Sequence, residues 1–336
     1  MQELIEALCG PACAGRRPGT PGGDAARALV VAALRDAGLD PREQPLAACG
    51  GANVIAKIRG DVDRYVLVGA HFDHLGTIGR DIYRGADDNA AAVAVLVEVA
   101  RALAHEHHGR GVIIAAFDAE EPPYFQSGAM GSRAFLHDCQ DPIDFMVCMD
   151  LVGHRFGSAV VPDEVGASLF ALGAERSAGT LDVVARRKRV EPGLIVRPAD
   201  AEIIPPLSDY AAFWDARIPF LFLSAGRSRV YHTPQDVPEL LDHGKIAATA
   251  RWLTGFVREA RTRGGAEFLD DGRLDRGTLD EVRELVAALA PLTGEATPAL
   301  RRIDELLASC DRAGALPNRR RAELGGLVSM LEQRLG

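Results

Sequence analysis

The sequence predicts an α/β fold with a largely parallel sheet, flanked by helices and followed by a C-terminal helical extension. Three observations predict it: several short apolar runs, helical stretches between them, and a final segment that carries only helical patterns. A strand covered on both faces is apolar at almost every position. These runs are therefore typical of a sheet that lies between two layers of helices.

Along the chain, the first predicted element is a helix over residues 22–38, which Gly38 ends. The strand-like apolar runs are residues 53–58, 65–69, 112–117, 145–149 and 218–223. Residues 89–104 and 238–261 are predicted to be helices between and after these strands. The stretch 89–104 is apolar nearly all round, so we expect it to be a buried helix.

The last part of the chain differs, because the strand pattern stops after Gly264 and Gly265. A capping-box sequence beginning at Thr278, a Thr-Pro pair at 297–298 and leucines from 324 to 335 predict three amphipathic helices. We therefore divide the chain into residues 1–264 and residues 265–336. Short helices are marginal alone, so these should pack on the first part. A homo-oligomer contact and a substrate entrance are the alternatives.

The composition excludes several classes of protein. The formal net charge is -9, which argues against nucleic acid as a partner. There is no run of about 18 apolar residues to span a membrane, and the first residues lack the pattern of a secretory signal. Six cysteines are scattered without paired CxxC motifs. These observations favour a soluble cytoplasmic protein with reduced thiols.

Potential metal ligands follow three of the predicted strands. They are His71 after the second apolar run, Glu120 and Glu121 after the third, and Asp150 after the fourth. In open α/β sheets, ligand sites gather at the carboxyl ends of the strands. We therefore expect these side chains to meet in one cleft.

Two further residues complete the set. Asp88 lies in the block 85–89, directly before the predicted buried helix, and His232 lies in a loop after the fifth apolar run. Alone, Asp88 resembles an ordinary helix N-cap and His232 a surface histidine. Together with the strand-end residues they give two imidazoles and three carboxylates, which suit zinc in a catalytic site. Because one aspartate can bridge two metals, we expect two zinc ions per chain.

Two acids have expected roles besides metal binding. Adjacent residues at a strand end project differently, so Glu120 can face a metal-activated water as general base while Glu121 binds metal. Asp73 lies two residues from His71 and points the same way in an extended segment. Its carboxylate is therefore expected to accept the second ring N–H of His71.

These residues carry a resemblance to the M28 family of zinc aminopeptidases. The matching blocks stand in the family's order: GAHFD at 69–73, GADDN at 85–89, the acidic pair at 120–121, Asp150, and YHTPQD at 231–236. The segment GRRPGT at 15–20 is also similar to the family's amino-terminal part, and the similarity covers roughly residues 1–262.

The resemblance implies a role for each residue. It assigns one zinc to His71 and Asp150, the other to Glu121 and His232, the bridge to Asp88 and the base to Glu120. It further implies that Tyr231 contacts the reacting carbonyl oxygen. The implied fold is the mixed, mostly parallel sheet of zinc-dependent exopeptidases. The implied reaction is hydrolysis of the N-terminal peptide bond of short peptides.

Two departures and two alternatives accompany this hypothesis. Ala90 and Ala91 replace the Ser-Gly usual in the family, and the loop 122–129 is longer, so side-chain preference is not carried over. One alternative is a glutaminyl-peptide cyclotransferase, which uses a similar scaffold with one zinc. The other is a non-catalytic binding protein on a peptidase-like fold. That second alternative usually requires lost ligands, and none is missing here.

Overall fold

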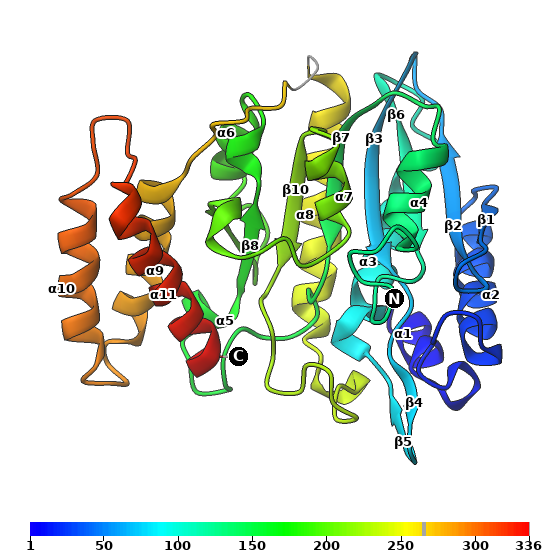
Figure 1. The fold of residues 1–336 in the computed structure, drawn as a ribbon, viewed down its shortest axis with the longest axis horizontal. Helices are drawn as coiled ribbons and strands as arrows, with labels where there is room; N and C mark the ends of the chain where they lie inside the picture. Colours follow the sequence, from blue (N-terminus) through cyan, green and yellow to red (C-terminus); the bar gives the residue numbers. More distant parts are fainter. Residues whose placement is uncertain (264–266, 336) are drawn as a thin grey trace.

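A mixed sheet of eight strands forms the centre of the computed structural model, which describes residues 1–263 and 267–335. The strand order is β1-β2-β6-β3-β7-β10-β8-β9, and helices cover both faces (Figure 1). The predicted fold class is confirmed, including the helices at the C-terminal end. The boundary at residues 264–265 lies outside the described residues, so the division of the chain at that point stays a prediction.

The strands of the sheet are β1 (Arg42–Leu46), β2 (Gly51–Ile58), β3 (Val62–His71), β6 (Arg110–Phe117), β7 (Ile143–Met149), β8 (Ser168–Leu172), β9 (Ile195–Ala199) and β10 (Phe220–Ser224). The strands β4 (Gly76–Ile78) and β5 (Asp81–Tyr83) form a separate hairpin, which projects beyond the lower edge of the sheet in Figure 1. All five predicted strands are present, and β1, β8 and β9 are additional.

The four central strands run parallel, which decides where their ends meet. β3 pairs in parallel with both β6 and β7, and β7 pairs in parallel with β10. β2 is antiparallel to β6, and β8 is antiparallel to β10. The C-terminal ends of β3, β6, β7 and β10 therefore share one edge of the sheet.

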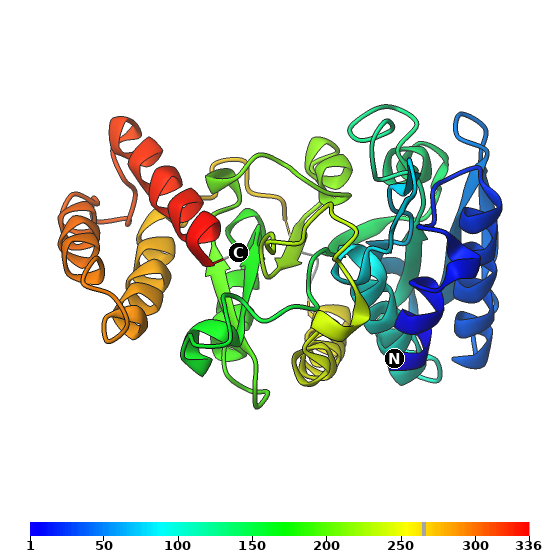
Figure 2. The same ribbon diagram turned by 90° about the horizontal axis from the view of Figure 1, so that it is seen from below.

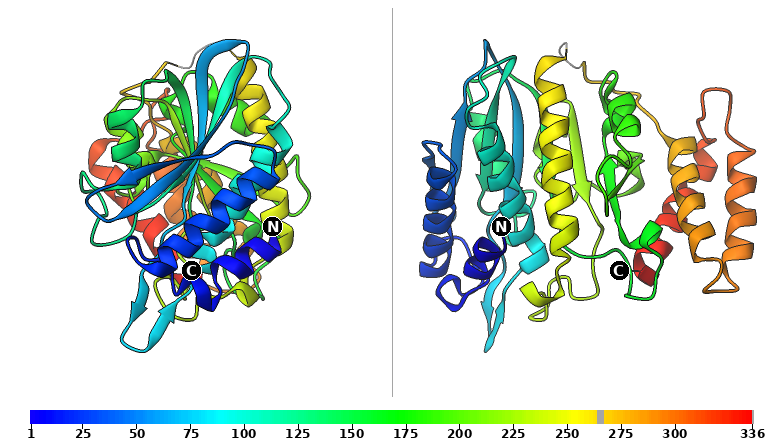
Figure 3. Two further views of the ribbon diagram at one scale, coloured as in Figure 1. Left: turned by 90° about the vertical axis from the view of Figure 1, so that its right-hand side faces the viewer. Right: turned by 180° about the vertical axis from the view of Figure 1, so that it is seen from behind.

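One face of the sheet packs against five helices: α1 (Gln2–Leu8), α2 (Pro21–Asp36), α3 (Ala91–Leu103), α6 (Thr180–Arg186) and α8 (His243–Thr262) (Figure 3). α2 begins at its N-cap Thr20, whose side chain accepts the N–H of Gly23. α8 begins after Asp242, whose carboxylate accepts the N–H of Lys245, and this start lies later than the predicted residue 238. Asp and Thr at these positions satisfy amide groups that the first turn leaves unpaired.

The opposite face carries α4 (Gly131–Asp138) and α7 (Tyr210–Asp215), which pack aromatic residues against β6 and β10 (Figure 2). Shorter helical segments are Pro11–Cys13, α5 (Asp163–Gly166), Ala174–Arg176, Ala201–Ile203 and Pro238–Leu240. Within residues 1–263 and 267–335, every helix is too short or too polar to cross a bilayer.

Three helices end the chain: α9 (Asp275–Leu289), α10 (Ala296–Leu307) and α11 (Asn318–Leu335). They share an apolar cluster centred on Leu279, Ile303 and Leu324. Leu285 of α9 packs with Phe156 and Val165, which lie outside the three helices. The helices thus lie beside β9, at the end of the sheet farthest from β1 (Figure 1).

A buried arginine fastens α9 to the sheet. The side chain of Arg197, in β9, is fully buried, and its Nη1 lies 2.8 Å from Oε2 of Glu281 and 3.2 Å from Oε2 of Glu284.

The predicted capping box is wrong, because α9 begins at Asp275 rather than after Thr278. Thr278 lies inside the helix, where its hydroxyl accepts the N–H of Asp200 and donates to the carbonyl of Leu274.

Candidate metal centre

The predicted ligands that follow the strands lie at one edge of the sheet. His71 is the last residue of β3, the acids Glu120 and Glu121 follow β6, and Asp150 comes directly after β7. Since these strands are parallel neighbours, their ends present the side chains to a common space. All four side chains are buried.

Unusual backbone conformations aim these side chains. Ala119, Leu151 and His232 have φ values of 60°, 57° and 56°, in the left-handed region that non-glycine residues seldom adopt. Ala119 precedes the acidic pair, and Leu151 follows Asp150. Non-glycine residues in this region carry strain of about 1–3 kcal/mol each, and such strain gathers at functional sites. The strained turns therefore mark the same edge that the ligands mark.

Asp88 lies in the turn η2 (Ala86–Ala90), which precedes α3 and in which the backbone of Asp88 and Asn89 is not helical. The α-helix itself starts at Ala91, so the predicted start at residue 89 is two residues too early. Several hydrogen bonds hold the turn; among them, the carboxylate of Asp236 accepts the N–H of Asp88 at 3.1 Å, and the Asn89 side chain donates to the carbonyl of Met149 at 2.9 Å. Asp88 is thereby placed between β7 and the loop of His232.

Asp88 is the residue that the two histidines share. Its Oδ1 lies 3.5 Å from Nε2 of His71, and its Oδ2 lies 3.2 Å from Nε2 of His232. His71 Nε2 also lies 3.5 Å from Oδ1 of Asp150, and His232 Nε2 lies 3.2 Å from Oε2 of Glu121. Two ligands of one tetrahedral zinc, each about 2.0–2.1 Å from the ion, are about 3.4 Å apart. The spacing therefore fits two neighbouring ions.

The polarity of the site also fits a pair of cations. Within the described residues, several buried atoms of the site have no hydrogen-bond partner, among them His71 Nε2, Asp88 Oδ2, Asp150 Oδ1 and His232 Nε2. Burying polar atoms without partners is costly, and the cost is relieved when they bind a metal. The donor set consists of imidazole nitrogens and carboxylate oxygens, the usual set of a catalytic zinc site.

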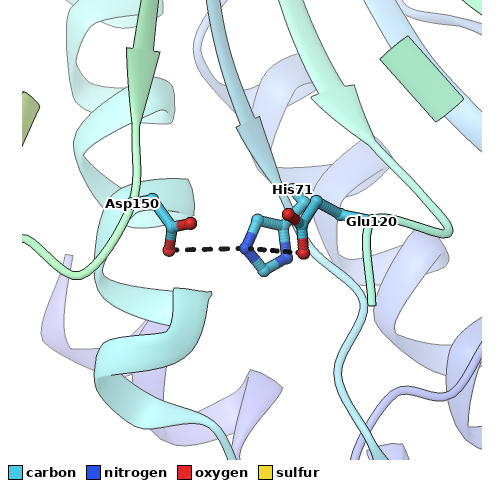
Figure 4. A group of neighbouring side chains, drawn as sticks. All are labelled: His71, Glu120 and Asp150. Atoms are coloured by element: carbon cyan, nitrogen blue, oxygen red, sulfur yellow. Dashed lines mark ion pairs between the residues drawn. The ribbon is translucent and has the colours of Figure 1, made fainter. Parts of the chain in front are cut away.

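Glu120 stands close to the first pair, and its carboxylate forms with His71 and Asp150 a group whose potential ligand atoms all lie within 4.8 Å of one another. Its Oε2 lies 3.8 Å from Nε2 of His71, and its Oε1 has no hydrogen-bond partner among the described residues. Figure 4 shows the carboxylates of Glu120 and Asp150 each joined by a dashed line to the same nitrogen of the His71 ring. Burial raises the pKa of Glu120 well above its ordinary value, and the nearby carboxylates of Asp150 and Glu121 raise it further.

The two histidines respond to the carboxylates around them. Burial alone would lower the pKa of His71, but the charges of Glu120 and Asp150 outweigh it and raise that pKa. Burial also opposes protonation of His232, whose pKa is nevertheless raised to about 10 by the carboxylates of Asp88 and Glu121, each 3.2 Å from its Nε2. The electrostatic field of the site thus favours positive charge at both rings.

The predicted role of Asp73 needs correction. Nδ1 of His71 lies 3.3 Å from the backbone carbonyl of Asp73 and 3.6 Å from its carboxylate, so the carbonyl is the closer acceptor. The Asp73 carboxylate instead accepts the backbone N–H groups of Glu120 and Glu121, each at 3.1 Å. Asp73 is therefore a link between the ends of β3 and β6.

His74 is a site residue for which the sequence indicated no role. Its Nδ1 lies 2.7 Å from Oε1 of Glu121, and its ring meets that of His232 edge to face at 5.8 Å. The short contact is a hydrogen bond that orients Glu121, because two ligands of one metal would lie farther apart. Together with the His232 ring, whose Nε2 lies 3.2 Å from Glu121 Oε2, it lowers the pKa of Glu121 against the effect of burial.

A buried ion-pair network supports the loop that follows Asp150. The carboxylate of Asp87 accepts the N–H groups of Gly153 and His154 and lies 2.6 Å from Nδ1 of His154. Lys245 of α8 donates to the carbonyl of His154 at 2.8 Å. Asp87 was visible in the sequence as the neighbour of Asp88, but its partners lie more than sixty residues away.

A hollow of about 150 Å³ opens above the ligands. It is lined by Asp88, Glu120, Glu121, Asp150, Tyr231 and His232, among others. The ring of Tyr231 stacks on that of His232, with centroids 3.9 Å apart. Burial raises the pKa of Tyr231, with the carboxylates of the site adding to the rise, so its hydroxyl stays protonated and is able to donate.

Known proteins share parts of this sequence. The chain matches the sequence model of Peptidase family M28 over residues 53–257. It is 26% identical over 219 residues to the uncharacterized protein YfbL of Escherichia coli, covering 58% of this chain and 67% of that protein. It is 30% identical over 125 residues to a probable zinc metalloprotease of Pyrenophora teres f. teres, covering 36% of this chain and only 26% of that protein.

Solved structures share the fold. The LapA aminopeptidase of Legionella pneumophila superposes with a TM-score of 0.64 at 16% identity, over 78% of this chain and 72% of that one. A glutaminyl cyclase of Porphyromonas gingivalis superposes with a TM-score of 0.62 at 21% identity, over 77% of this chain and 96% of that one. At such identities the likeness concerns the fold alone. The sequence match, which covers more than half of the chain, shows that the protein belongs to peptidase family M28.

Proposed function

We propose that the protein is a co-catalytic di-zinc aminopeptidase that hydrolyses the N-terminal bond of short peptides. The observation that carries the proposal is the position of Asp88. Its two oxygens face different histidines, at 3.5 Å and 3.2 Å, and each histidine has one further carboxylate beside it. A single bridging aspartate between two such sets is the arrangement of a two-metal site.

The ligands divide into two groups around this bridge. His71 and Asp150 would hold one zinc, and His232 and Glu121 would hold the other, with Asp88 common to both. When bound, the two ions polarise a substrate carbonyl and lower the pKa of a coordinated water. His74 keeps Glu121 in the orientation that this division needs.

Glu120 supplies the proton transfers. Its carboxylate lies within the ligand set but makes no hydrogen bond through Oε1, so it is free to take a proton from the attacking water. Its raised pKa means that it holds this proton well enough to deliver it to the leaving amine. Tyr231, from the wall of the hollow, would donate its hydroxyl to the oxygen that becomes negatively charged.

The metal ligands themselves would serve hydrolysis of any amide. Release of single N-terminal amino acids therefore needs support from outside the ligand set. The family supports a peptidase, and the structural likeness extends to both an aminopeptidase and a glutaminyl cyclase. A second complete set of ligands favours hydrolysis over cyclisation, since the one-zinc alternative leaves that set without a use.

The test uses zinc-loaded protein with a panel of aminoacyl-4-nitroanilides, dipeptides, their N-acetylated forms and a peptide with N-terminal glutamine. We expect release of free amino acids from unblocked substrates and loss of the activity with a chelator. Equal cleavage of acetylated peptides would contradict recognition of the amino end. Formation of the cyclic product from glutamine, with no other reaction, would establish the cyclotransferase instead.

A further inference from the structure

A second hollow adjoins the one above the ligands, and the C-terminal helices build one side of it. Its sheet side consists of Phe170 and Leu172 of β8 and Phe222 of β10. The C-terminal helices contribute Val282 and Leu285 of α9 and Val328 and Leu331 of α11, together with the polar residues Thr278, Glu281 and Glu332. The lining of this second hollow is therefore largely apolar, whereas carboxylates and imidazoles line much of the first hollow.

The two hollows have walls in common at the end of β10. Ile204, Phe222, Ser224, Gly226 and Glu332 line both of them. Four of these residues come from the sheet and its loops, and Glu332 comes from the last turn of α11. A ligand held above Asp88 and Glu120 therefore lies next to the entrance of the apolar hollow.

An ion pair fixes the position of the α11 wall. Oε1 of Glu332 accepts both the backbone N–H and the Nε–H of Arg227, each at 3.1 Å, and Oε2 lies 3.1 Å from Nη2. Arg227 stands five residues before His232, in the same loop. Figure 1 shows α11 ending at the lower edge of the sheet, the edge at which β4 and β5 project. The last turn of the chain is thus tied to the loop of a proposed zinc ligand.

We propose that α9 and α11 form one wall of a subsite for a large apolar side chain on the first residue of the substrate. This inference rests on the proposed aminopeptidase function, in which a single residue precedes the scissile bond. The apolar hollow has a volume of about 90 Å³. Whole ligands occupy pockets of about 300–1,000 Å³, so this space is suited to one side chain rather than to a separate ligand.

The lining sets the expected preference. A leucine or phenylalanine side chain would leave water for contact with Phe222, Val328 and Leu331, whereas an alanine side chain would not reach them. Differences of a few methylene groups in an apolar pocket change kcat/KM by factors of about 10–200. We expect leucyl and phenylalanyl substrates to be cleaved at least about 10-fold more efficiently than alanyl substrates.

The experiment compares Leu-, Phe- and Ala-4-nitroanilide on the full-length, zinc-loaded protein and three variants. Val328→Trp fills the hollow from α11, and Leu331→Ala enlarges it. Gln333→Trp places the same indole at an exposed position of α11 and serves as control. Val328→Trp should lower kcat/KM for the leucyl and phenylalanyl substrates at least about 10-fold and leave the alanyl substrate within about 3-fold. Leu331→Ala should shift the preference from leucine toward phenylalanine, and Gln333→Trp should change neither ratio.

A second measurement separates this inference from the proposed function. Binding of free leucine and free alanine is measured by calorimetry on the zinc-loaded wild type and on Val328→Trp, with thermal unfolding of each variant as a check of folding. Leucine should bind more tightly than alanine to the wild type only. If no substrate is cleaved but this difference is seen, the subsite holds and the proposed function fails. Equal binding, or unchanged substrate ratios in both cavity variants, would overturn the subsite while leaving aminopeptidase activity intact.

Discussion

The carboxylate of Asp73 accepts the backbone N–H of Glu120 at 3.1 Å, which couples the end of β3 to the acid proposed as general base. Its second oxygen accepts the N–H of Glu121 at the same distance. The buried Asp73 carboxylate thus fixes the backbone position of both Glu120 and Glu121. The base and the adjacent ligand cannot shift independently, and the strained Ala119 that precedes them is held in place.

Asp73→Asn should weaken zinc binding without abolishing it. An amide offers one acceptor oxygen, and its NH₂ group would face the second backbone N–H, so the acidic pair would move. Loss of such a supporting partner reduces metal affinity or activity by about 10–100-fold. Zinc affinity measured by competition with a chelator, together with kcat, checks this. Asp81→Asn, on the exposed β4–β5 hairpin, is the control and should leave both values unchanged.

Glu120→Gln and Glu121→Gln should separate proton transfer from metal binding. The first variant keeps the size of the side chain but cannot accept a proton, so we expect zinc content like that of the wild type with turnover reduced about 10²–10⁴-fold. The second removes a charged ligand and should lower zinc content. Elemental analysis and peptidase assays on both proteins are the measurements. Near-normal turnover by Glu120→Gln would exclude the assigned role.

The bridging position of Asp88 predicts a difference between two ligand variants. His232→Ala removes a ligand of one zinc only, so bound zinc should fall from about two to about one per chain. Asp88→Ala removes a ligand of both and should lower occupancy at each. Zinc per chain is measured after dialysis against a fixed free zinc concentration. The same stoichiometry for both variants would contradict a shared aspartate.

Attachment of α9 to the sheet should depend on a buried charge pair. Glu281→Ala leaves the fully buried Arg197 with only part of its compensation, since Glu284 and two oxygen acceptors remain. Removing one partner of a buried pair typically costs about 3–5 kcal/mol, and the remaining partners place the expected loss near the lower value. The matched control is Asp304→Ala, which breaks the half-exposed pair of α9 with α10 and should cost less than about 1 kcal/mol. Denaturant unfolding of both variants tests the contrast.

The sequence predicted the central strands and the ligand edge because both depend on local signals. Strands buried on both faces are apolar throughout, and their parallel order brings His71 and Asp150 together. Two of the three missed strands, β1 and β9, lack that signal. β1 alternates exposed and buried residues and contains Pro45, whereas β9 contains Arg197 and Pro198, which are unusual in a strand. Arg197 is accommodated only because residues of α9, far along the chain, neutralise it.

The roles of the residues that support the site could not be predicted from the sequence, because their partners lie far away along the chain. His74 gains its role from Glu121, and Asp87 gains its role from His154, so neither role is visible until the chain has folded. The left-handed backbone at Ala119 and His232 leaves no trace in residue type, because neither is glycine. Glu332, finally, lies in a segment outside the family match and reaches the site only through the packing of α11.

The long separation of the ligands along the chain has a consequence for biosynthesis. The first proposed ligand is residue 71 and the last is residue 232, and the turn that carries Asp88 is held by Asp236. When the first half of the chain has left the ribosome, His232 has not yet been made, so the two proposed zinc sites cannot both be complete. Completion of both proposed zinc sites must wait until β10 and the loop after it, which carries His232, have emerged and joined the sheet. Loading with the second zinc would then report that translation has passed this point and that the central strands have assembled in their proper order.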